Sequence, residues 1–145
     1  MLKFTFILIA LLSALPLAAA DPPPSPAGVW KTVDDKTNKP RGLIRIFEQD
    51  GTIFGKIEAS FDPEEARSVC AKCTGDRKDK PIIGLLIMSD MKKKGSEYLG
   101  EILDPDTGWT YRCRMTLEDG GQKLLVRGFL GMALFGRTQT WFRQQ

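Results

Sequence analysis

WTYRCRMTLE, residues 109–118, carries the clearest structural pattern in the chain. One face of an extended backbone here would hold the apolar or aromatic side chains, which are Trp109, Tyr111, Cys113, Met115 and Leu117. The side chains between them are polar, and the alternation continues over all ten residues. This predicts a β-strand with one buried and one solvent-facing side. Strands of this kind belong to antiparallel sheets, because parallel sheets are usually covered on both faces.

Shorter patterns of the same period surround this strand and are separated by turn signals such as Gln49-Asp50-Gly51. We predict strands over residues 29–33, 43–48, 52–59, 98–103, 123–128 and 137–143. The apolar run 82–87 is either a strand or a short helix, and the lysine run 92–94 before Gly95 is expected to form a solvated turn. Seven or eight meandering strands favour an all-β fold, a small closed antiparallel barrel of about eight strands, because closure removes exposed edges.

One short helix is predicted from Pro63 to about Val69. Asp62 can cap it, Pro63 suits its first position, and Glu65 completes a pattern like a capping box.

The first 20 residues resemble a secretory signal peptide. Lys3 is followed by an apolar run over residues 4–17, and Ala18, Ala19 and Ala20 supply the small residues that signal peptidase requires. We therefore expect cleavage after Ala20 and a periplasmic or secreted protein. The Pro-rich residues 21–27 are expected to form an extended, mobile leader. Residues 28–145 would then form a single barrel domain.

Composition limits the classes of function. Removing Lys3 with the signal leaves 20 of the 21 basic residues against 18 acidic ones, which is too balanced to indicate a nucleic-acid partner. The chain has no histidine, so it lacks the commonest general base and the partner of most serine and cysteine nucleophiles. We expect a monomeric, non-catalytic protein that does not span a membrane and has no cofactor or metal.

Three cysteines leave more than one pairing open. Cys70 and Cys73 form a Cys-x-x-Cys motif, but the predicted helix precedes it, whereas redox motifs sit at a helix N-terminus where the dipole favours thiolate. A zinc site would lack its fourth ligand. A structural disulfide between Cys70 and Cys73, with Cys113 a buried thiol, is our preferred interpretation. The alternative joins one of them to Cys113 and closes a loop of about 40 residues, which removes on the order of 4 kcal/mol of chain entropy from the unfolded state.

The last predicted strand suggests a ligand site. If Trp141 faces the barrel interior, then Gln139, Arg137 and Arg143 face inward as well. Inward polar groups must be satisfied by one another, by water or by a ligand. We predict that the candidate ligand-binding residues are Tyr111, Met115, Arg137, Gln139 and Trp141. At one end, a cation–π contact between Trp30 and Arg143 would close the barrel.

Several short motifs together carry a family resemblance over nearly all of residues 28–143. They are Gly28-x-Trp30, Gly55-x-Ile57, Cys70-x-x-Cys73-x-Gly75, Lys80-Pro81-x-x-Gly84-Leu85, Ile102-x-Asp104-Pro105-x-x-Gly108-x-x-Tyr111, Val126-Arg127-Gly128 and Gly136-Arg137-Thr138-Gln139-x-Trp141-x-Arg143. The chain resembles the bacterial domain-of-unknown-function 2147 family. This resemblance implies an exported barrel of the calycin or lipocalin kind and implies no established activity.

We therefore expect an exported β-barrel that binds a small apolar or amphipathic molecule, or an envelope component. The first alternative is a protein-interaction module with a plugged barrel that uses residues 61–95 as its contact surface. The second is a thiol–disulfide oxidoreductase that uses Cys70 and Cys73.

Overall fold

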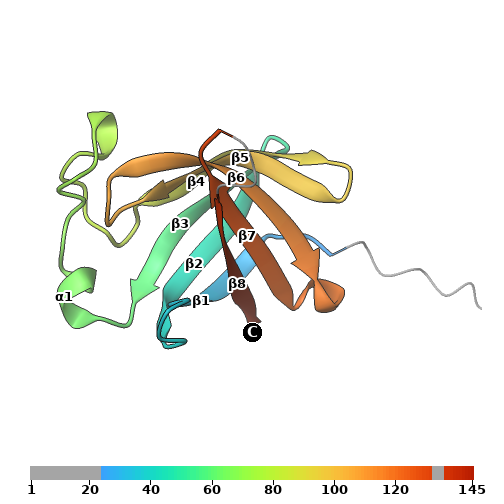
Figure 1. Cartoon of the computed structure of the whole chain (residues 1–145), viewed down its shortest axis with the longest axis horizontal. Coiled ribbons are helices and arrows are strands. Elements are labelled where there is room, and N and C mark those ends of the chain that lie inside the picture. Colours follow the sequence, from blue (N-terminus) through green and yellow to red (C-terminus); the bar gives the residue numbers. More distant parts are fainter. Residues whose placement is uncertain (1–23, 132–135) are drawn as a thin grey trace, which may run out of the picture.

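The computed structural model describes residues 24–131 and 136–145. These residues form eight antiparallel strands, each paired with the next, and the last strand pairs with the first to close a barrel (Figure 1). This confirms the predicted small all-β barrel with one short helix. The strands are β1 (Gly28–Val33), β2 (Pro40–Gln49), β3 (Thr52–Ser60), β4 (Leu86–Lys94), β5 (Glu97–Asp104), β6 (Trp109–Glu118), β7 (Lys123–Phe129) and β8 (Gly136–Gln144).

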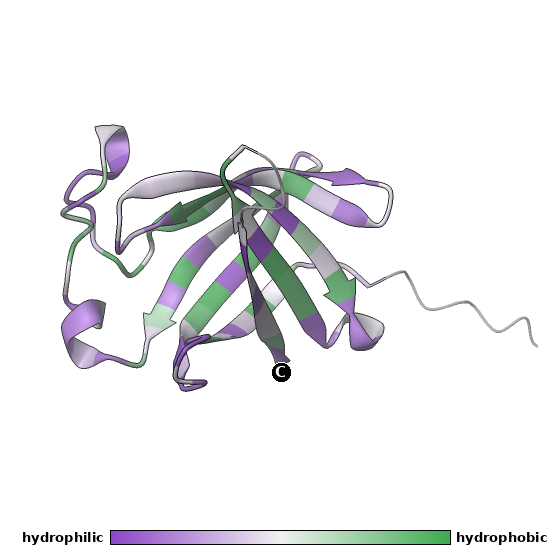
Figure 2. Cartoon of the chain, viewed as in Figure 1, coloured by the Kyte–Doolittle hydropathy of each residue, from purple (hydrophilic) through white to green (hydrophobic). Residues whose placement is uncertain are grey.

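The alternation predicted for β6 is present over most of the strand. Cys113 and Met115 are buried, and Arg112 on the other face is exposed. Similar alternating bands of hydropathy cross neighbouring strands (Figure 2). Trp109 is the exception, since 59% of it is exposed. It is the first residue of β6 and pairs with Asp104, the last residue of β5, so it lies at the end of the barrel wall.

β4 corrects two predictions. The strand runs from Leu86 to Lys94, so residues 82–85 precede it and the three lysines belong to it rather than to a turn. Its register shifts between Ser89 and Lys92, where Asp90 has a φ of 54°. Because of this bulge, Met88 and Met91 are both fully buried although they are three residues apart. The bulge breaks the period of two on which the sequence-based prediction relied.

The hairpin between β2 and β3 agrees with the sequence. Asp50 and Gly51 connect the strands and have φ values of 51° and 75°. Two consecutive residues with positive φ form the type I′ turn, whose twist matches that of paired strands.

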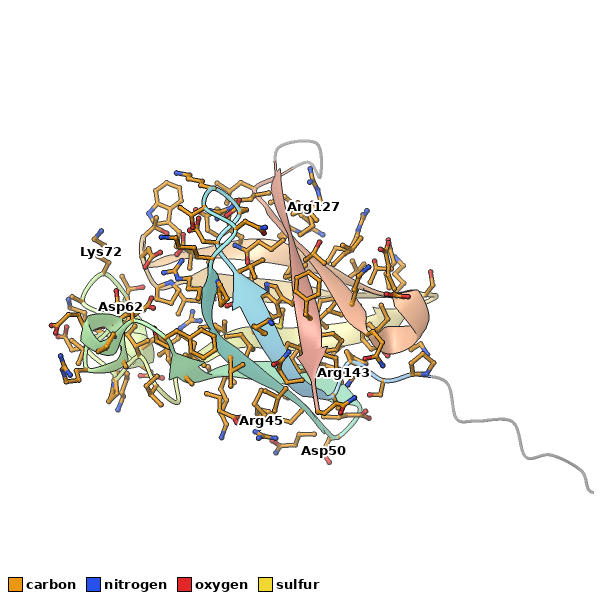
Figure 3. The ribbon with its side chains drawn as sticks, turned by 90° about the horizontal axis from the view of Figure 1, so that it is seen from below. Arg45, Asp50, Asp62, Lys72, Arg127 and Arg143 are labelled. Carbon is orange, nitrogen blue, oxygen red and sulfur yellow. A yellow bond between two sulfur atoms is a disulfide. The ribbon has the colours of Figure 1, made fainter. Side chains whose placement is uncertain are left out.

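Residues 61–85 leave the barrel between β3 and β4. They contain α1 (Pro63–Ala66), which is shorter than the predicted helix, and the Asp62 carboxylate caps it by accepting from the Glu64 N–H at 2.9 Å. The Glu65 side chain does not complete a capping box, because it accepts from Ser60 and pairs with Arg41 instead. Figure 3 shows Asp62 and Lys72 on this excursion, to one side of the barrel.

One end of the barrel is closed by Trp30 and Arg143. The Arg143 guanidinium lies 4.3 Å from the centre of the Trp30 ring, and Trp30 has no exposed surface. Arg143 also donates hydrogen bonds to the carbonyl oxygens of Gly121, Ala27 and Ser25, at 2.6, 2.8 and 2.7 Å. Burial lowers the pKa of Arg143. An arginine still keeps its charge at any physiological pH.

The second half of the leader is part of this closure. Trp30 Nε1 donates to the Pro26 carbonyl at 2.8 Å, and Pro26 is fully buried. The prediction of a mobile spacer is therefore wrong for Ser25, Pro26 and Ala27, because the inward arginine and tryptophan need acceptors and this segment supplies them. The predicted signal peptide and residues 21–23 lie outside the described residues. In the described ranges, no helix is both long and apolar enough to cross a membrane.

Candidate functional site

A cavity of about 600 Å³ lies inside the barrel, at the end opposite the Trp30–Arg143 closure. Its position follows from the strands. Thr32 and Val33, at the end of β1, and Gly136 and Arg137, at the start of β8, line it, whereas the other ends of these two strands hold Trp30 and Arg143. Its apolar wall includes Ile44, Ile57, Ile82, Ile87, Ile102, Leu103, Val126, Phe129 and Leu130. Cavities of this size and lining are typical of small-molecule sites.

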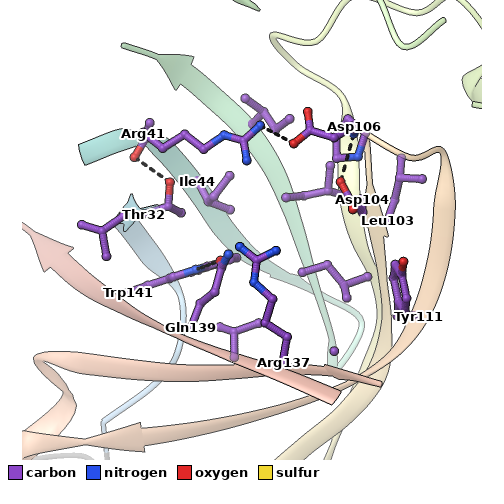
Figure 4. A pocket seen from close by; sticks show the side chains of 18 of the residues that line it. Thr32, Arg41, Ile44, Leu103, Asp104, Asp106, Tyr111, Arg137, Gln139 and Trp141 are labelled. Carbon is purple, nitrogen blue, oxygen red and sulfur yellow. Dashed lines mark hydrogen bonds and ion pairs between the residues drawn. The ribbon is translucent and has the colours of Figure 1, made fainter. Parts of the chain in front are cut away.

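Four of the five candidate ligand-binding residues line this cavity: Tyr111, Arg137, Gln139 and Trp141 (Figure 4). Met115 does not, which corrects that part of the prediction. It is fully buried in the hydrophobic core and pairs across the sheet with Tyr98 and Val126. Of the inward-facing residues of β6, Tyr111 therefore lines the cavity, whereas Cys113 and Met115 pack in the core deeper in the barrel.

Trp141 and Gln139 form an internal hydrogen bond in the cavity wall. Trp141 Nε1 donates to Gln139 Oε1 at 3.0 Å, and Trp141 is almost completely buried. The bond satisfies the indole N–H, which would otherwise be a costly unpaired donor. It also fixes the orientation of the Gln139 amide.

Arg137 lies at the cavity rim and is held by a carboxylate. Its guanidinium forms a two-pronged ion pair with Asp35, in the loop between β1 and β2. This hydrogen bonding raises the pKa of Arg137 and lowers the pKa of Asp35. Both groups are therefore charged at neutral pH, and the pair ties β8 to the β1–β2 loop.

A second rim contact was not predicted. Arg41, at the start of β2, pairs with Glu65 of α1 at 2.9 Å and with Asp106 of the β5–β6 turn at 2.7 Å. Partial burial by itself lowers the pKa of Arg41, but hydrogen bonds to Asp106 and Glu65 outweigh it and raise the pKa above its ordinary value. Glu65 and Asp106 lie 24 and 65 residues from Arg41 in the sequence, so no local sequence pattern could have predicted these ion pairs.

The disulfide loop packs against the same rim. Cys70 and Cys73 are bonded to each other and Cys113 is free, which confirms the preferred pairing. Lys72 donates to the Asp106 carbonyl at 2.8 Å, and a Cβ at Gly108 would lie only 2.0 Å from the Lys72 carbonyl oxygen. The disulfide thus holds a loop that braces the β5–β6 turn. Its sulfur-bearing residues are only 1% and 2% exposed, which weighs against an accessible redox centre.

Cys113 is a buried thiol in the core, and burial raises its pKa from the ordinary value of 9.0 to about 12. An unfolded chain ionises this thiol near pH 9, whereas the folded chain keeps it protonated. Its contribution to stability is therefore complete below pH 9 and is lost as the pH rises toward 12.

We expect the free energy of unfolding to fall by about 1 kcal/mol more between pH 8 and pH 10 in the wild type than in Cys113→Val. Urea unfolding at both pH values measures this, and equal pH dependence in the two proteins would contradict it.

Comparison with known proteins agrees with the fold. A solved structure described as protein HP1028 from the human pathogen Helicobacter pylori, a member of the lipocalin family, is similar to this chain with a TM-score of 0.72. The two chains are 20% identical, and the match covers 84% of each. No curated protein matches the sequence. The model of the family described as "Uncharacterized protein conserved in bacteria (DUF2147)" matches residues 28–143. This match covers all eight strands except the last residue of β8, and the chain therefore belongs to the DUF2147 family.

Proposed function

We propose that this protein is an exported carrier or receptor that binds a small apolar or amphipathic molecule inside its barrel, without catalysis. One observation supports this above the others. A cavity of about 600 Å³ with a largely apolar wall lies at one end of the barrel, and core side chains fill the interior toward the end that Trp30 and Arg143 close. That volume would hold on the order of 20 water molecules. Replacing water against an apolar wall with an apolar ligand is favourable. Export is supported by the signal-like residues 1–20.

Binding is favoured over catalysis by the state of the polar groups around the cavity. Arg137 and Arg41 are paired with carboxylates. The Asp104 carboxylate accepts from the Asp106 N–H at 2.9 Å and from the Thr107 hydroxyl at 3.1 Å. Groups committed to one another in this way hold the rim in shape, whereas a catalytic site needs an acid, base or nucleophile directed at a substrate.

A protein-interaction module remains the second candidate because apolar side chains are exposed on and beside the 61–85 excursion. Phe61, Val69, Ile83 and Leu86 are each at least one-third exposed. None of these four side chains lines the cavity. The two functions can therefore be separated by testing the cavity alone.

The direct test is binding of N-phenyl-1-naphthylamine, a neutral apolar dye whose fluorescence rises in apolar sites. We expect saturable one-to-one binding to the wild type. Native mass spectrometry of protein purified from its own host is expected to show a bound small molecule as well. A wild-type protein that neither binds the dye nor carries a molecule would contradict the proposal.

Gly128 allows the bound dye to be located. This residue lines the cavity, and a Cβ added to it would make ordinary contacts of 3.5 Å with Ile102 and 3.7 Å with Tyr111. We expect Gly128→Phe to weaken dye binding about tenfold by occupying the cavity, an effect of about 1.4 kcal/mol. Gly128→Ala controls for the loss of glycine and should bind nearly as the wild type does. If Gly128→Phe binds the dye unchanged, the dye is held somewhere other than in the cavity.

A further inference from the structure

The orientation of the Gln139 amide is determined by its neighbour. An indole N–H can donate a hydrogen bond but cannot accept one. Because Trp141 Nε1 lies 3.0 Å from the Gln139 side chain, the amide atom facing it must be the oxygen. The amide nitrogen, with its two N–H donors, is therefore on the other side. Gln139 lines the cavity, and Figure 4 shows it beside Trp141.

These donors are not used by the described part of the chain, in which Gln139 Nε2 makes no hydrogen bond. The Tyr111 hydroxyl, further along the cavity wall, also has no partner among the described side chains and backbone groups. The charged side chains of the cavity lining, in contrast, are all ion-paired or hydrogen-bonded within the protein. The cavity thus offers an apolar wall with uncommitted hydrogen-bond donors from two residues.

Charge at the rim narrows the choice of ligand. Arg41 and Arg137 are the two cations, and the described side chains that surround or pair with them provide four carboxylates, which are Asp35, Glu65, Asp104 and Asp106. An anionic headgroup would therefore meet an excess of negative charge and find both guanidinium groups occupied. An ammonium group could approach the rim, but it could not accept from Gln139 or Tyr111.

We propose that the cavity selects neutral ligands that present a carbonyl oxygen to the Gln139 amide nitrogen, with the Tyr111 hydroxyl as a second donor. This rests on the proposed ligand-binding function and specifies the chemistry of the ligand. The carbonyl oxygen accepts from the otherwise unpaired N–H groups, and the apolar remainder lies against the isoleucine-rich wall.

The test compares twelve-carbon ligands that differ in their headgroups. Methyl laurate, laurate and dodecylamine compete with N-phenyl-1-naphthylamine at concentrations below micelle formation. We expect methyl laurate to bind the wild type about tenfold more tightly than laurate or dodecylamine, the size of effect that one satisfied hydrogen bond produces. If laurate or dodecylamine binds as tightly as methyl laurate, the inference is wrong.

Gln139→Met keeps the length of the side chain and removes its donors. We expect this variant to bind methyl laurate more weakly, and its preference for methyl laurate over the dye, which has no carbonyl, to fall about tenfold. Gln144→Met is the matched control, because Gln144 lies on the same strand and donates to the Phe142 carbonyl rather than lining the cavity. Equal affinity of Gln139→Met and the wild type for methyl laurate would overturn the inference.

The Met variant leaves the Trp141 N–H without its acceptor, so its melting temperature is measured alongside. If Gln139→Met does not fold, the test rests on Tyr111→Phe and on the order of ligand affinities for the wild type. We expect Tyr111→Phe to weaken the binding of methyl laurate more than that of laurate or dodecylamine. Failure of all the ligands and of the dye to bind the wild type would refute the ligand-binding function itself. Dye binding without selectivity for the carbonyl would refute only the inference made here.

Discussion

Replacing Trp30 with alanine is expected to lower the free energy of unfolding by about 3–5 kcal/mol. The side chain is completely buried, its Nε1 donates to the Pro26 carbonyl, and Arg143 lies over its ring. Truncation would leave a large cavity at the closed end, an unpaired carbonyl oxygen and a guanidinium without its aromatic contact. Urea unfolding followed by far-UV circular dichroism measures the loss.

Trp109→Ala is the matched control, because the same side chain is 59% exposed at the other end of the barrel. We expect a change within about 0.5 kcal/mol for this variant, as for most surface substitutions. Equal losses at the two positions, or a loss below 1 kcal/mol for Trp30→Ala, would show that the closed end is not the energetic centre that its burial indicates.

Arg143→Met should cost about 2–4 kcal/mol of stability, the second largest effect. The variant keeps much of the apolar stem but loses the charge-assisted hydrogen bonds to Gly121, Ala27 and Ser25, and the cation–π contact with Trp30. Arg143→Lys should recover only part of the loss, because an ammonium cannot reach three separated carbonyl oxygens as the guanidinium fork does.

Arg45→Met provides the comparison for this second variant. Arg45 pairs with Glu58 on the outer surface, where an exposed ion pair contributes only about 0–1 kcal/mol. Trp30→Ala combined with Arg143→Met should cost less than the sum of the single losses, since each variant removes the same contact. Strict additivity in the double variant would mean that the two side chains do not act together. If Arg143→Met loses no more stability than Arg45→Met, then Arg143 does not stabilise the closed end of the barrel.

Much of the fold could be predicted because it depends on local periodicity. The alternation in β6 and the Asp50-Gly51 turn each specify a backbone geometry by themselves. The inward direction of β8 followed from the same period, and it placed Gln139 and Trp141 together in one wall.

What could not be predicted depends on long-range contacts or on broken periodicity. The bulge at Asp90 shifts β4 out of phase, so its two buried methionines do not fit a period of two. The Arg41 contacts join three segments that only the folded barrel brings together. Met115 faces the barrel interior as predicted, but it lies in the core below the cavity. The alternation of side chains shows which residues face inward and not how far along the barrel axis they lie.

The pairing of β1 with β8 also constrains how the molecule can be made. Arg143 binds carbonyl groups 116 and 118 residues earlier in the chain. A ribosome releases the N-terminal segment first, so β1 emerges long before the partner that completes its edge. Until β8 has been synthesised, β1 has an unpaired edge and Arg143 cannot close its end of the barrel. Unpaired strand edges promote aggregation. The barrel of this topology therefore cannot close before β8 has been synthesised.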